Sequence, residues 1–461
     1  MPFCAASSPW IWLSRCGPIS MPAPVAARQP PTSAPSGPGC WWSVPPPSAR
    51  RRCGNGSRQC WPRVMPTRAE LTHDVIVVGG GPAGSATALR LARAGRRVLL
   101  LDRARFPRDK PCSEYASPET VRHLDALGVL PRLEAAGTTA LTGSTVAADR
   151  GGQLSGRFAA AGGTPFRPTG LALPRLLLDA TLLAAAREAG VTVREGSRVR
   201  DLSWRSDGLP QLALADPSAQ PLLARVIVGA DGLGSRVARS TGLRRQGWLR
   251  RTAFVAHVQG VQGLGQQAEL HVGPAGYVGL NPLTADTANV ALVVPAGTVG
   301  GGIAPLDDFL ARSLERYPGV RGRVDLRQTT REILTTGPFD ARCSRSVAPG
   351  VVLVGDAADF FDPFTGEGIW SALTGAELAA ATIDEALDTP GPVTVDRLRG
   401  YRTARRKAFG EKWLVERLIG YAMLAPALFD CSLRLLERTG RGHRMIGVTG
   451  GFVPVRRLVF G

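Results

Sequence analysis

The chain has 461 residues, of which 44% are hydrophobic, and a formal net charge of +19. This length predicts two or three globular domains. No uncharged apolar run approaches the ~20 residues that cross a bilayer, and no basic stripe with interleaved aromatic residues accompanies the charge. An integral membrane protein and a nucleic-acid-binding protein are therefore excluded.

The first 64 residues differ from the rest of the chain. They contain seven Arg, no acidic residue, thirteen Pro and five of the eight Cys, without helical or strand periodicity. Such a composition does not build a core, so we predict that residues 1–64 are a disordered or non-native extension before a start near Met65. A transit peptide is the alternative, although the segment lacks an amphipathic pattern. Only Cys112, Cys343 and Cys431 follow, which favours a reducing, cytoplasmic location.

The segment from residue 73 to residue 102 is typical of one β–α–β unit. A β-branched strand over 73–78 runs into Gly79-Gly80-Gly81-Pro82-Ala83-Gly84, and helical periodicity follows to Gly95. A second strand over 97–101 ends on Asp102. This order of strand, glycine loop, helix, strand and acid predicts a dinucleotide-binding domain.

Each glycine in this loop has a geometric role. Gly79 permits the tight turn, Gly81 lets the backbone approach a pyrophosphate, and Gly84 lets the helix pack on the strand. The pyrophosphate then lies at the helix N-terminus, where unpaired N–H groups favour an anion. Asp102 is placed to accept hydrogen bonds from the adenosine ribose, and its charge disfavours a 2′-phosphate there. The pattern alone does not separate NAD from FAD.

Two later segments each contain a strand that ends in a polar turn. The first is a strand over 225–228 that leads into Gly229-Ala230-Asp231-Gly232. The second is a strand over 351–354 that leads into Gly355-Asp356, residues 362–368 and a long helix to about Leu387. Each turn is common by itself. Their order and spacing behind a glycine loop indicate FAD.

Together the three motifs resemble the flavoprotein superfamily of aromatic-ring hydroxylases, flavin halogenases and geranylgeranyl reductases, over most of residues 72–387. The resemblance implies that Asp356 binds ribityl or ribose hydroxyls and that the backbone from Gly366 onward faces the pyrimidine edge of the flavin. The helix N-terminus there would stabilise negative charge on reduced flavin. The residues implied in cofactor binding are Gly79, Gly81, Pro82, Ala83, Gly84, Asp102, Asp231, Gly232, Gly355, Asp356, Pro363, Gly366, Glu367 and Gly368.

Two segments narrow the resemblance to the reductase branch. Lys110-Pro111-Cys112-Ser113 is similar to the Lys-x-Cys-Gly segment of geranylgeranyl reductases, in which the Cys lies near the flavin, although Ser113 replaces the usual Gly. Residues 362–369 are similar to the reductases' Ser-Pro-x-Thr-Gly-Glu-Gly-Ile. The resemblance implies a catalytic role for Cys112, and a small buried hydrophobic residue is the structural alternative.

A third segment departs from the reductases. Tyr277 and Pro282 match their Tyr-x-Trp-x-Phe-Pro pattern, but Gly279 and Asn281 replace the two large apolar side chains. This loss weakens the case for a polyprenyl substrate and argues against a halogenase. Tyr277 is the second catalytic candidate, and a surface aromatic residue on a strand is its structural alternative.

The expected fold class is α/β, with a doubly wound, Rossmann-like FAD-binding domain, an inserted β-rich substrate domain and a helical C-terminal extension. The FAD-binding domain is expected over 70–248 and again over 341–390, where the flavin-facing helix lies. The substrate domain is expected over 249–340, with strands at 252–258, 268–272, 287–294 and 326–334.

Residues 391–461 are expected to form Arg-rich helices. Packing across the FAD-binding domain is one interpretation of these helices. The other is peripheral contact with a membrane through a basic amphipathic surface.

These patterns predict an FAD-dependent oxidoreductase that takes electrons from NADH or NADPH. We expect reduction of a double bond in a hydrophobic or secondary-metabolite-like substrate. The alternatives are an aromatic monooxygenase acting through a C4a-hydroperoxyflavin, and a non-catalytic prenyl-lipid carrier, against which Asp102, Asp231 and Asp356 argue. No metal site and no nucleic-acid partner is expected. The sequence leaves the substrate, the nicotinamide donor and the oligomeric state open.

Overall fold

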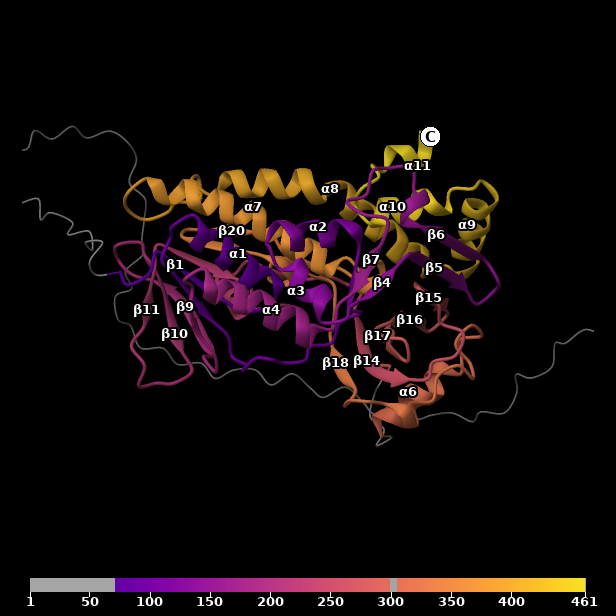
Figure 1. Ribbon diagram of the computed structural model, residues 1–461. Helices are drawn as coiled ribbons and strands as arrows, with labels where there is room; N and C mark the ends of the chain where they lie inside the picture. Colours follow the sequence, from indigo (N-terminus) through magenta and orange to yellow (C-terminus); the bar gives the residue numbers. More distant parts are fainter. Residues whose placement is uncertain (1–70, 299–304, 461) are drawn as a thin grey trace, which may run out of the picture. The chain divides into compact units, whose positions relative to one another are not determined.

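The structure is a computed structural model that describes residues 71–298 and 305–460 (Figure 1). Residues 1–64, for which a disordered or non-native extension is predicted, lie outside the described residues. The described residues belong to one compact unit, so the boundaries proposed at 248, 340 and 390 stay a prediction. Among the described residues, no helix combines the length and the hydrophobicity that a membrane crossing needs.

A six-stranded sheet forms the centre of the predicted FAD-binding domain. All neighbouring strands in it are parallel except the edge pair β20–β21. The order across the sheet is β20 (Val347–Ala348), β21 (Val351–Leu353), β12 (Val226–Gly229), β1 (Val75–Val78), β2 (Val98–Leu101) and β8 (Thr192–Arg194). The strands expected from the sequence at 73–78, 97–101, 225–228 and 351–354 are therefore the central strands of this sheet.

Both faces of this sheet are covered, which explains why its strands are continuously apolar. Val75 and Val77 point into a core with three helices, α1 (Pro82–Arg93), α4 (Arg175–Glu188) and α7 (Gly368–Asp388). Ile76 and Val78 point into a second core on the opposite face. That face is covered by α5 (Arg236–Ser240) and a three-stranded sheet of β9 (Val199–Trp204), β10 (Pro210–Leu214) and β11 (Leu222–Leu223).

A seven-stranded sheet forms the floor of the predicted substrate region. Its order is β18 (Leu334–Thr336), β14 (Arg251–Gln259), β17 (Thr287–Pro295), β16 (Gly276–Pro282), β15 (Gln267–Gly273), β5 (Gly143–Ala148) and β6 (Gln153–Arg157). The last two strands precede the 249–340 segment, and β5 joins the sheet by parallel pairing with β15. The strand expected at 326–334 is wrong except for its last residue, Leu334, where β18 begins. Residues 326–328 form a 3₁₀ turn that Asp325 caps.

The remaining helices and strands connect these sheets or cover their edges. The C-terminal helices α9 and α10 lie beside β5 and β6 (Figure 1). The helices are α2 (Pro118–Ala126), α3 (Leu130–Ala135), α6 (Leu306–Leu314), α8 (Arg399–Ala422), α9 (Pro426–Arg438), α10 (Gly442–Thr449) and α11 (Arg456–Phe460). The strands are β3 (Tyr115–Ala116), β4 (Thr139–Leu141), β7 (Gly170–Ala172), β13 (Arg244–Gln246), β19 (Ala341–Cys343) and β22 (Asp359–Phe360).

Candidate active site

The glycine loop between β1 and α1 has the close contacts that its sequence predicts. Gly79 has a φ of 109°, and a Cβ there would lie 2.3 Å from the carbonyl oxygen of Ala230. A Cβ at Gly84 would lie 1.8 Å from the carbonyl oxygen of Gly79. Because backbone atoms cannot yield at such distances, only glycine fits at these two positions.

Asp102 ties the end of β2 to the glycine loop. One of its carboxylate oxygens accepts a hydrogen bond from Gly80 N at 2.6 Å, and the other accepts one from Ala104 N at 2.8 Å. An ionised carboxylate has about four acceptor positions, so acceptor capacity remains for ribose hydroxyls. Ribose binding by Asp102 stays a prediction.

Two arginines face the N-terminus of α1 beside the glycine loop. A Cβ on Gly81 would lie 3.6 Å from Nη2 of Arg108 and 3.8 Å from Nη2 of Arg175. Arg175 is 4% exposed and donates to both carboxylate oxygens of the buried Asp179, at 2.7 and 2.8 Å. Arg108 makes an ion pair of 3.0 Å with the same carboxylate. The helix N-terminus and the two guanidinium groups form a cradle that fits the pyrophosphate of FAD.

Our sequence reasoning missed Arg108 and Arg175. An Arg at the start of a helix with an Asp four residues later is usually a solvated surface pair. The available signal was the apolar context of α4, in which leucines surround Arg175 and Asp179.

Asp356 follows β21 at the opposite side of this loop and lines the cavity described below. Lys110 is its nearest cation, with Nζ 3.6 Å from a carboxylate oxygen. Gly355 has a φ of 56°, and a Cβ there would lie 2.9 Å from Cβ of Ala83. The strand end therefore approaches α1 closely enough for Asp356 and the glycine loop to contact one cofactor.

We expect Asp356→Ala to weaken FAD binding by about 10- to 100-fold, because a hydrogen bond to a charged group contributes about 1.5–3 kcal/mol. The measurement is the flavin-to-protein ratio after purification and the Kd for added FAD. Asp384→Ala is the matched control, since Asp384 lies on α7 and pairs at the surface with Arg96. Unchanged flavin content in the Asp356 variant would contradict the predicted role.

Asp231 stabilises its own turn. Its carboxylate accepts hydrogen bonds from Ser235 Oγ at 2.5 Å and from Arg236 N at 2.6 Å, where α5 begins. Burial raises the pKa of Asp231, and these hydrogen bonds oppose the shift. Gly232 has a φ of 75° and lines the cavity. Of this pair, Gly232 is therefore the one that lines the cavity.

The segment before α7 bends towards the cavity. Pro363 begins a 3₁₀ turn, and Gly366 follows with a φ of 72°, where a Cβ would lie 2.8 Å from the ring of Tyr115. Glu367 is 3% exposed and accepts a hydrogen bond from Ser117 Oγ at 3.1 Å. The helix itself begins at Gly368. The cavity lining includes residues of this segment, and their contact with the pyrimidine edge of a flavin stays a prediction.

Glu367 belongs to a buried group of charges that our sequence reasoning did not connect. Lys412 of α8 places Nζ 3.7 Å from a carboxylate oxygen of Glu367 and 4.1 Å from the ring centroid of Trp370. Burial raises the pKa of Glu367 to about 7 and lowers the pKa of Lys412. Glu416 lies on the next turn of α8 and accepts a hydrogen bond from Thr365 Oγ1 at 3.3 Å. The C-terminal helix thus takes part in the site.

Cys112 lines the cavity beside the arginine cradle. Its thiol accepts a hydrogen bond from Glu114 N at 3.3 Å, and its carbonyl oxygen accepts one from Asn289 Nδ2 at 2.8 Å. Burial raises the pKa of the Cys112 thiol, against the opposing charge of Arg175. The thiol is therefore protonated, and hence neutral, at pH 7.

Tyr277 is 3% exposed, so it is not the surface aromatic of the alternative interpretation. Its hydroxyl donates to Asp362 at 2.7 Å, and Arg251 donates to the same carboxylate at 2.9 Å. Burial and the negative charge of Asp362 raise the pKa of Tyr277 well above its usual value. The ring also packs edge-on against Phe364, with centroids 5.4 Å apart. Tyr277 thus holds residues 362–364 on the sheet.

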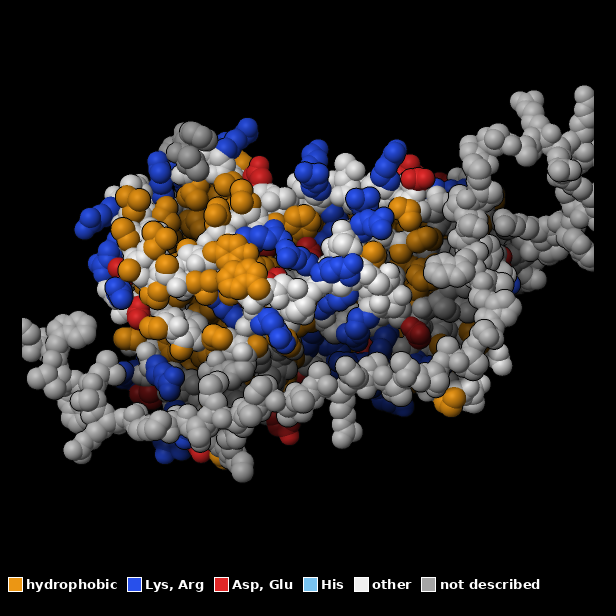
Figure 2. Space-filling view, turned by 180° about the vertical axis from the view of Figure 1, so that it is seen from behind, with side chains coloured by type: hydrophobic (Ala, Val, Ile, Leu, Met, Phe, Trp, Pro, Cys, Tyr) orange, Lys and Arg blue, Asp and Glu red, His pale blue; other side chains and the backbone are white. Residues whose placement is uncertain are grey.

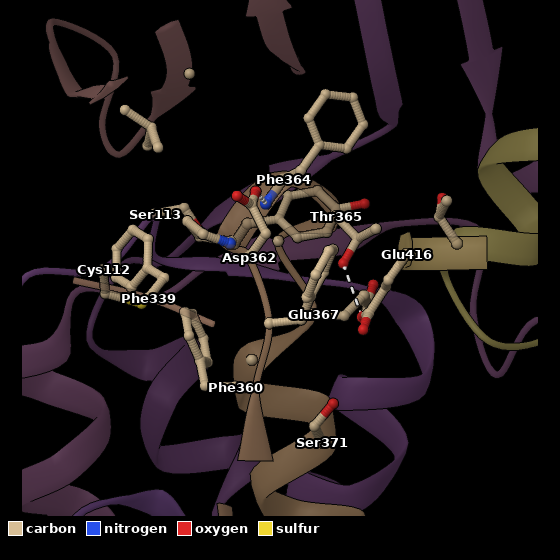
Figure 3. A pocket seen from close by; sticks show the side chains of 18 of the residues that line it. Cys112, Ser113, Phe339, Phe360, Asp362, Phe364, Thr365, Glu367, Ser371 and Glu416 are labelled. Atoms are coloured by element: carbon tan, nitrogen blue, oxygen red, sulfur yellow. Dashed lines mark hydrogen bonds between the residues drawn. The ribbon is translucent and has the colours of Figure 1, made fainter. Parts of the chain in front are cut away.

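One cavity of about 470 Å³ connects these groups. Figure 3 shows Cys112 at one side of the view and Glu416 at the other, with Asp362, Phe364 and Thr365 between them. The predicted residues that line the cavity are Gly81, Pro82, Ala83, Cys112, Gly232, Tyr277, Gly355, Asp356, Pro363, Gly366, Glu367 and Gly368. Four other predicted residues do not line the cavity, namely Gly79, Gly84, Asp102 and Asp231.

Away from the glycine loop, apolar side chains dominate the cavity. The floor is one face of the seven-stranded sheet, and the opposite wall comes from α8, α9 and α10. Gly279 lies in the middle of the floor, where a Cβ would have 3.8 Å to its nearest neighbour. Among the described residues, no group of His, Cys, Asp and Glu could hold a metal ion.

A doubly wound sheet with this glycine loop, acid and arginine cradle defines a dinucleotide-binding protein. The family described as FAD binding domain matches residues 72–414. A menaquinone reductase of Mycolicibacterium smegmatis is 30% identical over 396 residues, which cover 82% of this chain and 88% of that protein. A digeranylgeranylglycerophospholipid reductase of Methanococcoides burtonii is 28% identical and covers 74% of this chain and 81% of that protein.

The flavin-dependent brominase Bmp2 has a similar solved structure. The two structures superpose with a TM-score of 0.71 at 20% sequence identity. The superposed part covers 82% of this chain and 93% of the brominase chain, which supports the fold. The chain belongs to the FAD-binding domain family, within its geranylgeranyl reductase-like group. It is an FAD-dependent oxidoreductase, as the sequence predicted.

Proposed function

We propose that this enzyme reduces a carbon–carbon double bond of a lipid-like substrate, with electrons that NADH or NADPH supplies through FAD. The observation that carries the proposal is the apolar cavity that runs from the glycine loop, past Cys112, to the C-terminal helices. A cavity of about 470 Å³ with apolar walls suits a hydrophobic ligand. The relatives named menaquinone reductase and digeranylgeranylglycerophospholipid reductase take their names from lipid-like molecules.

Bound FAD would supply the hydride, and the protein contributes binding, orientation and a proton. Gly81, Arg108 and Arg175 would hold the pyrophosphate, and Asp102 and Asp356 the sugar and ribityl hydroxyls. Reduction of a double bond adds a hydride to one carbon and a proton to the other. Because the Cys112 thiol is neutral and lines the cavity, it is the proposed proton donor.

An aromatic monooxygenase is the second candidate. Gly279 and Asn281 leave room on the cavity floor for a ring-sized, partly polar substrate. The carrier hypothesis is not supported, because the chain is an FAD-dependent oxidoreductase.

Mass spectrometry of the product separates the two enzymatic candidates. The purified flavoprotein is first reduced with NADH or NADPH without oxygen, and menaquinone or a polyprenyl phosphate is then added. We expect a product whose prenyl chain is heavier by two hydrogens, formed without oxygen. A product heavier by one oxygen, formed only in air, would assign a monooxygenase and make Cys112 a bystander.

Gly279→Trp tests whether the cavity floor binds substrate. The indole would project into the cavity, and we expect kcat/KM to fall by about 10-fold or more, since overfilling a packed site costs about 1–3 kcal/mol. FAD content should stay unchanged. Gly279→Ala is the matched control, because its Cβ would make only an ordinary contact of 3.8 Å with Leu270. Equal kinetics in both variants would place the substrate elsewhere.

We further propose that the enzyme is cytoplasmic and reaches its substrate at a membrane surface. The Arg-rich C-terminal helices that form one wall of the cavity would make this contact.

A further inference from the structure

Helices α8 and α9 and the residues next to them carry a group of exposed apolar side chains. Seven of the ten large hydrophobic side chains that are exposed among the described residues lie on these helices or against them, each 40% to 63% exposed. They define what we call the C-terminal apolar face, which consists of Trp248, Leu414, Leu418, Tyr421, Leu424, Leu428 and Leu435. On α8 their spacing is i, i+4 and i+7, which places them on one side of the helix.

The opposite side of α9 is buried. Phe429 and Leu433 pack into the core beneath the substrate sheet, so α9 is anchored while Leu428 and Leu435 point outward. Trp248 stacks on Tyr421 with centroids 5.4 Å apart, which joins the loop before β14 to the same surface. The face is therefore a fixed part of the fold.

The C-terminal apolar face adjoins the cavity. Leu418 lines the cavity and is also 59% exposed, so one side chain belongs to both surfaces. Arg417 and Ser432 line the cavity at the same place, one from each helix. A long apolar ligand could thus leave the cavity between α8 and α9 and remain in contact with apolar side chains.

Positive charge predominates in the C-terminal part of the chain, which carries this face. Residues 391–461 contain fourteen Lys and Arg against five Asp and Glu. Arg406, Lys407 and Arg438 are exposed and make no ion pair with a described residue. Figure 2 shows hydrophobic side chains gathered on one part of this side of the molecule, with Lys and Arg side chains around them.

We propose that the C-terminal apolar face docks on an anionic phospholipid surface, and that the substrate chain enters the cavity from the bilayer beside Leu418. The positive charge of this region favours an anionic lipid surface over two other occupants. Two copies of the face would repel each other, and the Arg-rich residues 1–64 are also positively charged. Apolar side chains within a basic rim match the acyl region and the anionic headgroups of one leaflet. The entry route rests on the proposed function, whereas the docking does not require turnover.

Co-sedimentation of the full chain with substrate-free vesicles tests the docking. We expect binding to vesicles of phosphatidylcholine with one quarter phosphatidylglycerol, and weaker binding to pure phosphatidylcholine or at high salt. In the double variant Leu428→Ser, Leu435→Ser, the partition coefficient should fall by about 10-fold or more. Neither residue lines the cavity, so reduction of a detergent-solubilised substrate should persist.

Phe166→Ser, Leu176→Ser is the matched control, because it removes two exposed apolar side chains far along the chain from α8 and α9. It should bind vesicles like the parent. Equal binding by both double variants would overturn the docking face. A parent dimer in sedimentation velocity that becomes monomeric only in the Leu428, Leu435 variant, without vesicle binding, would assign the face to a second copy. Vesicle binding without any reductase activity would instead contradict the proposed function alone.

Discussion

Replacing Arg175 by Met should destabilise the protein by about 3–5 kcal/mol, because it leaves the fully buried Asp179 without its bidentate partner. The side chains are 5% and 0% exposed, so water cannot replace the guanidinium group. Arg108 still contacts Asp179, but through a single ion pair of 3.0 Å. Chemical denaturation gives the change in free energy of unfolding.

Two further variants separate stability from cofactor binding. Arg132→Met removes an equally short pair with Glu188 in which both side chains are more than half exposed, and such a pair contributes at most about 1 kcal/mol. Arg175→Met with Asp179→Leu removes both buried charges, so stability should largely return. FAD binding should not return, since Arg175 faces the loop at Gly81. Normal FAD affinity in the double variant would restrict Arg175 to a structural role.

Local pattern was sufficient to predict the FAD-binding half of the fold. The β1–loop–α1–β2 unit is contiguous, and its signals are steric: Gly79 and Gly84 stand where a Cβ would meet backbone within 2.3 Å. The strand ends at Gly232 and Asp356 reach the same cavity because parallel strands end at a common edge.

The parts that could not be predicted depend on contacts between distant segments. Strand β5 pairs with β15 across more than 100 residues, and nothing in either segment specifies that partner. In the sequence, Lys412 is one more cation on an Arg-rich helix. In the structure, it is buried against Glu367 and Trp370. The expected strand at 326–334 failed because too few apolar residues alternate there, and Asp325 instead caps a 3₁₀ turn.

Tyr277 makes a structural contact that the sequence did not predict. The pattern identified it through family resemblance, as a catalytic candidate. Its hydroxyl is already committed to Asp362, and Arg251 completes the buried trio. Within the cavity, we therefore propose Cys112 rather than Tyr277 as the proton donor, because the thiol accepts its hydrogen bond from Glu114 N and its own hydrogen is not committed to that bond.

Cys112→Ala should lower the rate of product formation by about 100-fold or more, the usual contribution of a general acid. FAD content and the rate of flavin reduction by the nicotinamide donor should not change, because the arginine cradle stays intact. The raised pKa keeps the thiol protonated through neutral pH, so in the parent the activity should decline only above the ordinary thiol value of 9.0. That alkaline decline should be absent in the residual activity of the variant.

Cys431→Ala is the matched thiol control, since Cys431 is exposed on α9 and should leave both rates unchanged with a detergent-solubilised substrate. Rapid-mixing measurements of flavin reduction and reoxidation distinguish the two half-reactions. If Cys112→Ala retains full turnover, the thiol is only a packing residue. The next candidate for the proton donor would then be Glu367, which also lines the cavity and whose pKa burial raises to about 7.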